Sequence, residues 1–190
     1  MNLLIQILIL NLSLLTLAEG KSGDDDILWR AGYKLRWEDF KGNPTFSTNY
    51  SEKSATKIRI EVTTMITKES YIFSVGCLFE KYNSWTVNDT SESLLNHEQL
   101  HFDIGEVFAR ELRKKISEMN DLTDSIIQDR VKVLYHEINN ACIKYEKKYD
   151  NETNNGRNLK EQKVWRDRIS NILQNSNKYS SLIVTLNKKR

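Results

Sequence analysis

The sequence is poor in the residues that mark several special classes of protein. One proline and seven glycines in 190 residues exclude a collagen-like chain and a chain disordered through proline and glycine. Two cysteines are too few for a disulfide-rich scaffold, and without a C-x-x-C spacing a structural cysteine–zinc site is not expected. Neither sign of charge dominates, because 28 Lys and Arg stand against 26 Asp and Glu, so nucleic acid is not an expected partner.

Long hydrophobic runs are also missing, apart from one at the N-terminus. Residues 3–17 are almost wholly apolar, which is shorter than the roughly 20 residues that a membrane span needs. The small-x-small step Ala18-Glu19-Gly20 follows, so we interpret residues 1–20 as a secretory signal peptide. The alternative is an uncleaved anchor, because the run has no Lys or Arg before it. We expect an exported mature chain without a membrane span, located in the periplasm or outside the cell.

The two cysteines leave two alternatives open. In an exported protein Cys77 and Cys142 can form one disulfide, which would stabilise the fold by roughly 4 kcal/mol in the chain-entropy model. The other alternative is a pair of buried free thiols.

The periodicity of apolar residues changes halfway along the chain. In the first half, alternation of period two predicts strands, with a hairpin turning at residues 68–70. In the second half, helical spacing predicts three helices, the first capped by Ser91 or Ser93. The predicted strands are 29–42, 55–66 and 71–80, and the predicted helices are 91–119, 122–149 and 159–174.

This order predicts an α+β fold in which N-terminal antiparallel strands precede about three long helices. The stretch from Ser181 to Leu186 is either a short strand or part of a C-terminal arm. The predicted organisation is a signal peptide (1–20), a polar leader (21–28), a single domain (29–177) and a C-terminal arm (178–190).

One motif carries chemistry. Of three histidines, two lie in His97-Glu98-Gln99-Leu100-His101, which is H-E-x-x-H on a predicted helix. Side chains at i and i+4 share a helix face, so both imidazoles can bind one Zn²⁺ ion. Glu98 lies about 100° further round the helix and can act on a metal-bound water as general base. The alternative is two core histidines that are hydrogen-bonded on an apolar face.

The residues around this motif resemble a family of exported bacterial proteins that are regarded as predicted zinc-dependent proteases of unknown function. Leu94 to Asp103 resembles the family's signature, and other blocks from Trp29 to Leu173 follow in the same order. These blocks are Leu35-x-Trp37-x-Asp39-Phe40-Lys41-Gly42, Ser84-Trp85, Ala109-Arg110-x-Leu112-Arg113-Lys114, Tyr149-Asp150-x-Glu152-Thr153 and Gln162-x-x-Trp165. The resemblance implies a zincin-like fold with H-E-x-x-H on the first long helix.

The chain departs from the family pattern at one place. After the Tyr-Asp-x-x-Thr block the family has a histidine where this chain has Asn155. Asn is a poorer zinc ligand than imidazole. If the family's histidine binds zinc or the oxyanion, this chain lacks that function.

A catalytic zinc site needs a third protein ligand. We prefer Asp150, which belongs to the Tyr-Asp pair of the resembling block, and place Glu152 second. Both are expected where a helix gives way to a loop, whereas His136 in mid-helix is a weaker candidate. The candidates for an oxyanion or substrate contact are Tyr149, Arg157 and Asn155.

Together these patterns predict a zincin-like metallohydrolase, most simply a peptidase, which holds one Zn²⁺ ion and acts on a peptide or protein. The alternative, motivated by Asn155, is a catalytically inactive exported binding protein on the same scaffold. A third hypothesis is a structural domain without metal. The sequence does not indicate the oligomeric state or the cleavage preference.

Overall fold

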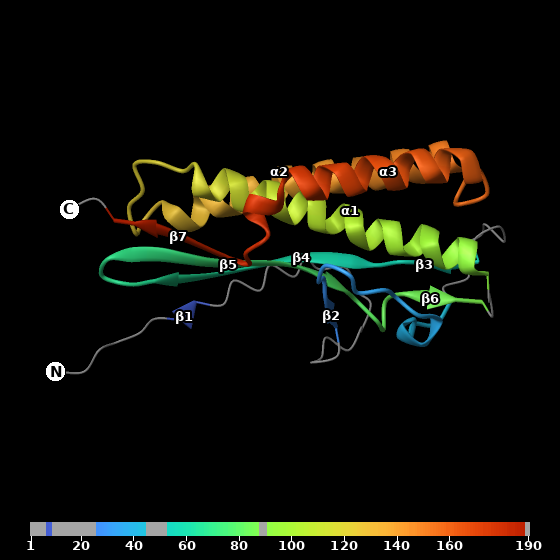
Figure 1. Cartoon of the computed structure of the whole chain (residues 1–190). Coiled ribbons are helices and arrows are strands. Elements are labelled where there is room, and N and C mark those ends of the chain that lie inside the picture. Colours follow the sequence, from blue (N-terminus) through green and yellow to red (C-terminus); the bar gives the residue numbers. More distant parts are fainter. Residues whose placement is uncertain (1–6, 9–25, 45–52, 88–90, 189–190) are drawn as a thin grey trace.

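The computed structural model describes residues 7–8, 26–44, 53–87 and 91–188 (Figure 1). The strands are β1 (Ile7–Leu8), β2 (Ile27–Leu28), β3 (Ser54–Ala55), β4 (Ile58–Ile66), β5 (Ser70–Phe79), β6 (Trp85–Thr86) and β7 (Ile183–Asn187). The helices are α1 (Glu92–Ser117), α2 (Ile127–Thr153) and α3 (Leu159–Asn175), with short 3-10 turns at Trp37–Asp39 and Asn177–Tyr179. This arrangement confirms the predicted α+β fold, with antiparallel strands before three helices.

The main sheet is built on the β4–β5 hairpin, whose register runs from Ile58↔Phe79 to Ile66↔Tyr71. Thr67 closes the turn, because its backbone N–H and its hydroxyl both donate to the Ser70 carbonyl. The strands β2 and β7 pair with the other edge of β5, and β1 pairs with β4. A separate two-stranded sheet joins β3 to β6. The predicted hairpin is therefore confirmed.

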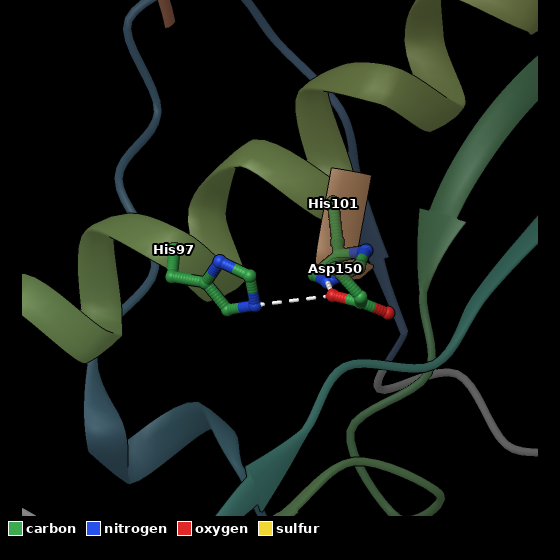
Figure 2. A group of neighbouring side chains, drawn as sticks. All are labelled: His97, His101 and Asp150. Atoms are coloured by element: carbon green, nitrogen blue, oxygen red, sulfur yellow. Dashed lines mark hydrogen bonds and ion pairs between the residues drawn. The ribbon is translucent and has the colours of Figure 1, made fainter. Parts of the chain in front are cut away.

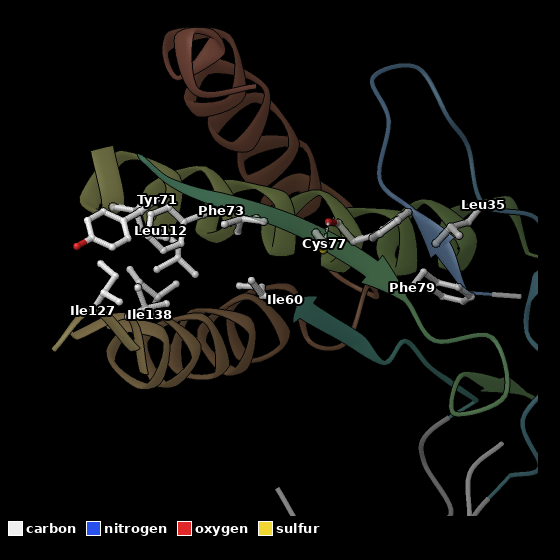
Figure 3. Close-up of a cluster of buried hydrophobic side chains, with 14 of the residues drawn as sticks. Leu35, Ile60, Tyr71, Phe73, Cys77, Phe79, Leu112, Ile127 and Ile138 are labelled. Carbon is white, nitrogen blue, oxygen red and sulfur yellow. Dashed lines mark hydrogen bonds between the residues drawn. The ribbon is translucent and has the colours of Figure 1, made fainter. Parts of the chain in front are cut away.

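All three helices lie on one face of the main sheet, and α1 is the helix nearest to it (Figure 1). Residues of β5 alternate, so that its buried side chains point towards the helices. They pack on Leu112 of α1 and on Ile127 and Ile138 of α2. Figure 3 shows Tyr71 at one end of this core and Phe79, with Leu35, at the other. The buried β5 residues of this cluster are Tyr71, Phe73, Val75, Cys77 and Phe79.

A second apolar cluster lies between the three helices. Leu100 and Ile104 of α1 pack there with Cys142 and Tyr149 of α2 and with Trp165 of α3. The helix α1 thus buries one face against the sheet and another against α2 and α3. His97 and His101 are buried at the start of α1, near the end of the molecule that holds β3 (Figure 1).

The predicted strand over residues 29–42 is wrong. None of these residues is paired as a strand: β2 ends just before them at Leu28, and a 3-10 turn occupies Trp37–Asp39. The backbone N–H of Leu35 donates to Gln99 Oε1 of α1 at 2.8 Å, and that of Arg36 donates to Asp39 Oδ2. Because side chains take these donors, the alternation of Tyr33 and Leu35 does not lead to strand pairing.

The helices lie close to their predicted positions, and Ser91 caps α1 as one of the two expected caps. One boundary is wrong in a way that affects the site: α2 continues to Thr153, so Asp150 and Glu152 lie in its last turns and not in a loop. Residues 183–187 are a strand of the main sheet, which decides between the two alternatives for the C-terminal segment.

Most of the predicted signal peptide and leader, residues 1–6 and 9–25, lies outside the described residues. Within the part that is described, none of the helices has the length and apolarity required to cross a bilayer.

Candidate metal centre

The site contains two histidines of α1, His97 and His101. They lie one helical turn apart, and their rings face each other edge to face with centroids 5.0 Å apart. Both are buried, with 3% of His97 and 8% of His101 exposed. Ser91 caps the helix six residues before His97, where its hydroxyl accepts from the Leu94 backbone N–H. The local sequence therefore fixes the helix on which both imidazoles lie.

Asp150 of α2 contacts both rings through one carboxylate oxygen (Figure 2). Its Oδ1 atom is 2.9 Å from His101 Nε2 and 3.2 Å from His97 Nε2. One ligand atom from each of the three residues lies within 4.8 Å of the others. Two imidazoles and a carboxylate are a donor set that suits Zn²⁺ and leaves a coordination position open. The three residues could therefore hold a metal ion, and their donor chemistry suits zinc.

The charges of the three side chains depend on one another. Burial opposes a charged His101, but hydrogen bonds with Asp150 and Glu146 outweigh it and raise the pKa of His101 to about 10. Burial alone would raise the pKa of Asp150, whereas its hydrogen bonds with His101 and His97 hold that pKa well below its usual range. Without a metal, the Asp150 carboxylate and the proton on His101 thus compensate one another.

Glu98 points from the same helix turn towards β3. It is 3% exposed, and its Oε1 accepts a hydrogen bond of 2.6 Å from Ser54 Oγ. A buried carboxylate requires such a partner, and the hydroxyl also fixes its orientation. Ser54 could not be predicted from the sequence, because it lies 44 residues away in a strand without a chemical motif.

A cavity of about 580 Å³ opens beside this cluster. Glu98 and the three potential ligands line it, and so do β3, the start of α1 and the α2–α3 connection. The predicted contacts Asn155 and Arg157 both border the cavity. Its lining residues outside the cluster are Lys53, Ser54, Ala55, Thr56, Ser91, Ser93, Leu94, Asn155, Gly156, Arg157 and Leu159.

The α2–α3 connection closes over His97. Asn154, Asn155 and Gly156 are consecutive residues with positive φ, at 51°, 50° and 79°. This turn places Gly156 so close to His97 that a Cβ atom at residue 156 would lie 2.9 Å from the ring atom Cγ. Only glycine therefore fits at this position.

Tyr149, one of the candidates for an oxyanion or substrate contact, is not among the residues that line the cavity. Its side chain is fully buried and stacks on the His97 ring, with the two ring centroids 4.6 Å apart. The hydroxyl donates to the His97 carbonyl oxygen and accepts from Gln162 Nε2. Burial raises the pKa of Tyr149 above its ordinary value, which keeps the phenol neutral.

The other candidate ligands lie elsewhere. Glu152 accepts a hydrogen bond from Trp165 Nε1 at 2.8 Å, on the side of α2 that faces α3. His136 packs against Tyr135 and is not part of the ligand cluster found among the described residues.

Of the two alternatives for the cysteines, the structure has the second, since Cys77 and Cys142 are both free and buried. They belong to different apolar clusters, Cys77 to the one on the sheet and Cys142 to the one between the helices. Burial raises the pKa of both thiols, so neither is a reactive thiolate.

The fold and the site define an α+β domain in which two buried histidines and a half-buried Asp150 form a cluster beside a cavity. The chain belongs to the family described as "Bacterial protein of unknown function (DUF922)", whose model matches residues 25–156. This confirms the resemblance to a bacterial family of unknown function. Neither the curated proteins nor the solved structures gave a match. The matched segment ends at the α2–α3 connection and does not include α3.

Proposed function

We propose that the chain is a zinc-dependent, zincin-like hydrolase, and specifically a peptidase. His97, His101 and Asp150 would hold one Zn²⁺ ion, and Glu98 would act as the general base and acid. The observation that carries this proposal is the placement of Glu98 in the same cavity as three ligand atoms that lie within 4.8 Å of one another. Two core histidines would need polar partners, but neither an open cavity nor a buried carboxylate beside them.

The chemistry is divided between the ion and the chain. A bound zinc ion supplies Lewis acidity towards a carbonyl oxygen and lowers the pKa of water to about 7. Glu98 would take a proton from this water and deliver it to the leaving amine, as a carboxylate held beside the site can do. Ser54 would keep the Glu98 carboxylate in place through its 2.6 Å hydrogen bond.

A peptide substrate would bind along β3. The strand borders the cavity, and among the described strands it pairs only with β6. An extended peptide can add to such an edge through main-chain hydrogen bonds. Thr56, which follows β3, also lines this cavity.

The test compares zinc content and peptide cleavage in the wild-type protein and Glu98→Gln. We expect both to bind one zinc ion, and we expect the variant to cleave a peptide library roughly 10²- to 10⁴-fold more slowly, because it lacks the base. Glu92→Gln is the matched control, since it makes the same chemical change on the same helix at an exposed residue outside the cavity. Equal cleavage by the wild type and Glu98→Gln would contradict the proposed base.

A binding protein on the same scaffold is the second candidate, and Asn155 favours it. This side chain borders the cavity where the resembling family has a histidine. Zinc binding without turnover of any peptide in the library would support this candidate over the peptidase.

The proposed export is tested separately, by N-terminal sequencing of the protein recovered outside the cytoplasm. Cleavage after about residue 20 is the expected result.

A further inference from the structure

We infer that Gln162 is a positioning residue of the metal centre: it fixes the proton of His97 on Nδ1 and leaves Nε2 as the nitrogen that binds metal. The inference rests on the proposed zinc site and adds to it a residue of α3, outside the segment that the family model matches. The observation behind it is a hydrogen-bond chain that runs from the His97 carbonyl through Tyr149 and Gln162 to the His97 ring.

The direction of every hydrogen bond in this chain follows from one fixed acceptor. The His97 carbonyl oxygen can only accept, so the Tyr149 hydroxyl donates to it, at 3.2 Å. With its proton used, that hydroxyl can only accept from the Gln162 carboxamide, which therefore presents its nitrogen to Tyr149. The carboxamide oxygen is then left facing His97 Nδ1, at 3.1 Å.

An amide oxygen has no proton to donate, so Nδ1 of His97 must carry one. A neutral imidazole with its proton on Nδ1 has its lone pair on Nε2. That nitrogen faces Asp150 Oδ1, 3.2 Å away, and donates to this carboxylate in the metal-free structure. Because Gln162 holds the proton on Nδ1, Nε2 is the nitrogen that a metal ion can bind, in exchange for the proton that Nε2 shares with Asp150.

Burial strengthens the preference for a proton on His97 Nδ1, because water cannot replace any member of the hydrogen-bond chain. The exposed fractions are 0% for Tyr149, 3% for His97 and 7% for Gln162. The helix α3 is held against α2 one turn further on, where Trp165 Nε1 donates to Glu152 Oε2 at 2.8 Å. Gln162 is therefore fixed in position as well as in orientation.

The other proposed histidine ligand, His101, also has a partner on its outer nitrogen, at a longer distance. His101 Nδ1 lies 3.5 Å from Glu146 Oε1, while its Nε2 faces Asp150. Glu146 precedes Asp150 by one turn on α2, so both acids face α1. Outer partners of this kind orient metal-binding histidines, and their loss typically lowers metal affinity about 10- to 100-fold.

The experiment measures zinc affinity, by competition with a chromophoric chelator, for the wild type, Gln162→Leu, Gln162→Glu and Ile169→Val. Leu removes the acceptor with little change in volume, and we expect an affinity loss of about 10- to 100-fold. Glu keeps an acceptor for Nδ1–H, so its affinity should stay at or above that of the wild type. Ile169→Val is the packing control, because Ile169 is buried on α3 but is neither one of the three possible ligands nor a member of the hydrogen-bond chain, and its affinity should be unchanged.

A second readout is independent of affinity. In long-range ¹H–¹⁵N spectra of the zinc-loaded protein, His97 should show a protonated Nδ1 and a zinc-bound Nε2. Tyr149→Phe should weaken this preference without removing Gln162, because the carboxamide loses the acceptor that orients it. This variant also serves as the test if Gln162→Leu does not fold.

Two results overturn the inference alone: wild-type affinity in Gln162→Leu, or a His97 that binds zinc through Nδ1. A wild-type protein that binds no zinc overturns the proposed function, and this inference with it. A merely structural role would lower the melting temperature of the metal-free Gln162→Leu protein and leave both the affinity and the tautomer as in the wild type.

Discussion

Each imidazole of the candidate site has a partner on both of its nitrogens. His97 lies between Gln162 and Asp150, and His101 lies between Glu146 and Asp150. The inner nitrogens share one carboxylate oxygen, whereas the outer ones have separate partners. This division of inner and outer partners is what a metal ion in the centre would require.

At the scale of single residues, two glycines with positive φ allow a matched comparison. Gly156 (φ 79°) packs against His97, while a Cβ at Gly32 (φ 82°) would have no atom within 4 Å. Alanine at either position costs about 1–2 kcal/mol in this backbone region. We expect Gly156→Ala to lose more stability than Gly32→Ala and to lower zinc affinity roughly 10-fold or more, because it displaces an imidazole ligand.

Denaturant titration and the chelator competition assay measure these two effects. Gly32→Ala should leave the affinity unchanged. Equal zinc affinity in the two variants would show that the α2–α3 connection does not position His97.

At the scale of elements, α1 is unusual because it is covered on two sides. Gly105 allows it to lie close to the sheet: a Cβ there would collide with Ile58 and would lie 2.6 Å from Cys77 Sγ. This close approach offsets the roughly 1 kcal/mol that glycine costs in a helix. It also leaves room for α2 and α3 on the other side, from which Asp150 and Gln162 reach the histidines.

A buried ion cluster joins the far half of α1 to other elements. Glu106 accepts from Arg110 and Arg113, and all three are at most 4% exposed. Arg113 also donates to the carbonyls of Val75 and Tyr179, and Arg110 donates to that of Leu173. Glu106 therefore has a structural role, separate from the histidine cluster.

We expect Glu106→Gln to lower the free energy of unfolding by about 3–5 kcal/mol, because it leaves two buried arginines without their carboxylate. Glu111→Gln is the control on the same helix, since this side chain is 42% exposed, and its effect should stay within about 0.5 kcal/mol. Urea denaturation of the metal-free proteins measures both. Similar losses in the two variants would mean that the buried cluster contributes no more than a surface pair.

At the scale of the whole molecule, the start of α1, β3 and the α2–α3 connection meet at one end (Figure 1). The site is therefore assembled from the sheet region and from all three helices, so its ligation state should affect global stability. Zinc that binds only the folded state stabilises it by an amount that grows with concentration.

The stability of the metal-free protein should depend on pH through His101. Its pKa is raised to about 10 in the folded state, against about 6.5 in an unfolded chain. A raised pKa means that this stabilisation is complete below about pH 6.5 and is lost as the pH rises towards 10. The pKa of Asp150 is lowered in the folded state, so the pH dependence of its contribution is the opposite. The stabilisation from Asp150 is present above about pH 4 and is lost as the pH falls further.

We therefore expect the chelator-treated wild type to lose stability between pH 6.5 and 10 relative to His101→Gln, which lacks the titrating ring. Thermal unfolding at a series of pH values measures the difference. Parallel curves for the two proteins would contradict the ion pair between His101 and Asp150.

The sequence by itself determined the elements that depend on near neighbours. Alternation predicted the β4–β5 hairpin, and helical spacing predicted three helices, because burying one face of a strand or helix constrains residues two to four positions apart. The same local geometry places His97 and His101 on one face and Glu98 beside them. Alternation failed at residues 29–42, where side chains of α1 and the 3-10 turn took the backbone donors.

Tertiary structure alone decided which distant groups complete the site. Asp150 and Glu152 are two residues apart, but the helix turns one towards α1 and the other towards Trp165. Ser54 reaches Glu98 across 44 residues of sequence, and Gln162 reaches His97 across 65. Such contacts have no local periodicity, because they depend on how the packed layers bring separate elements together.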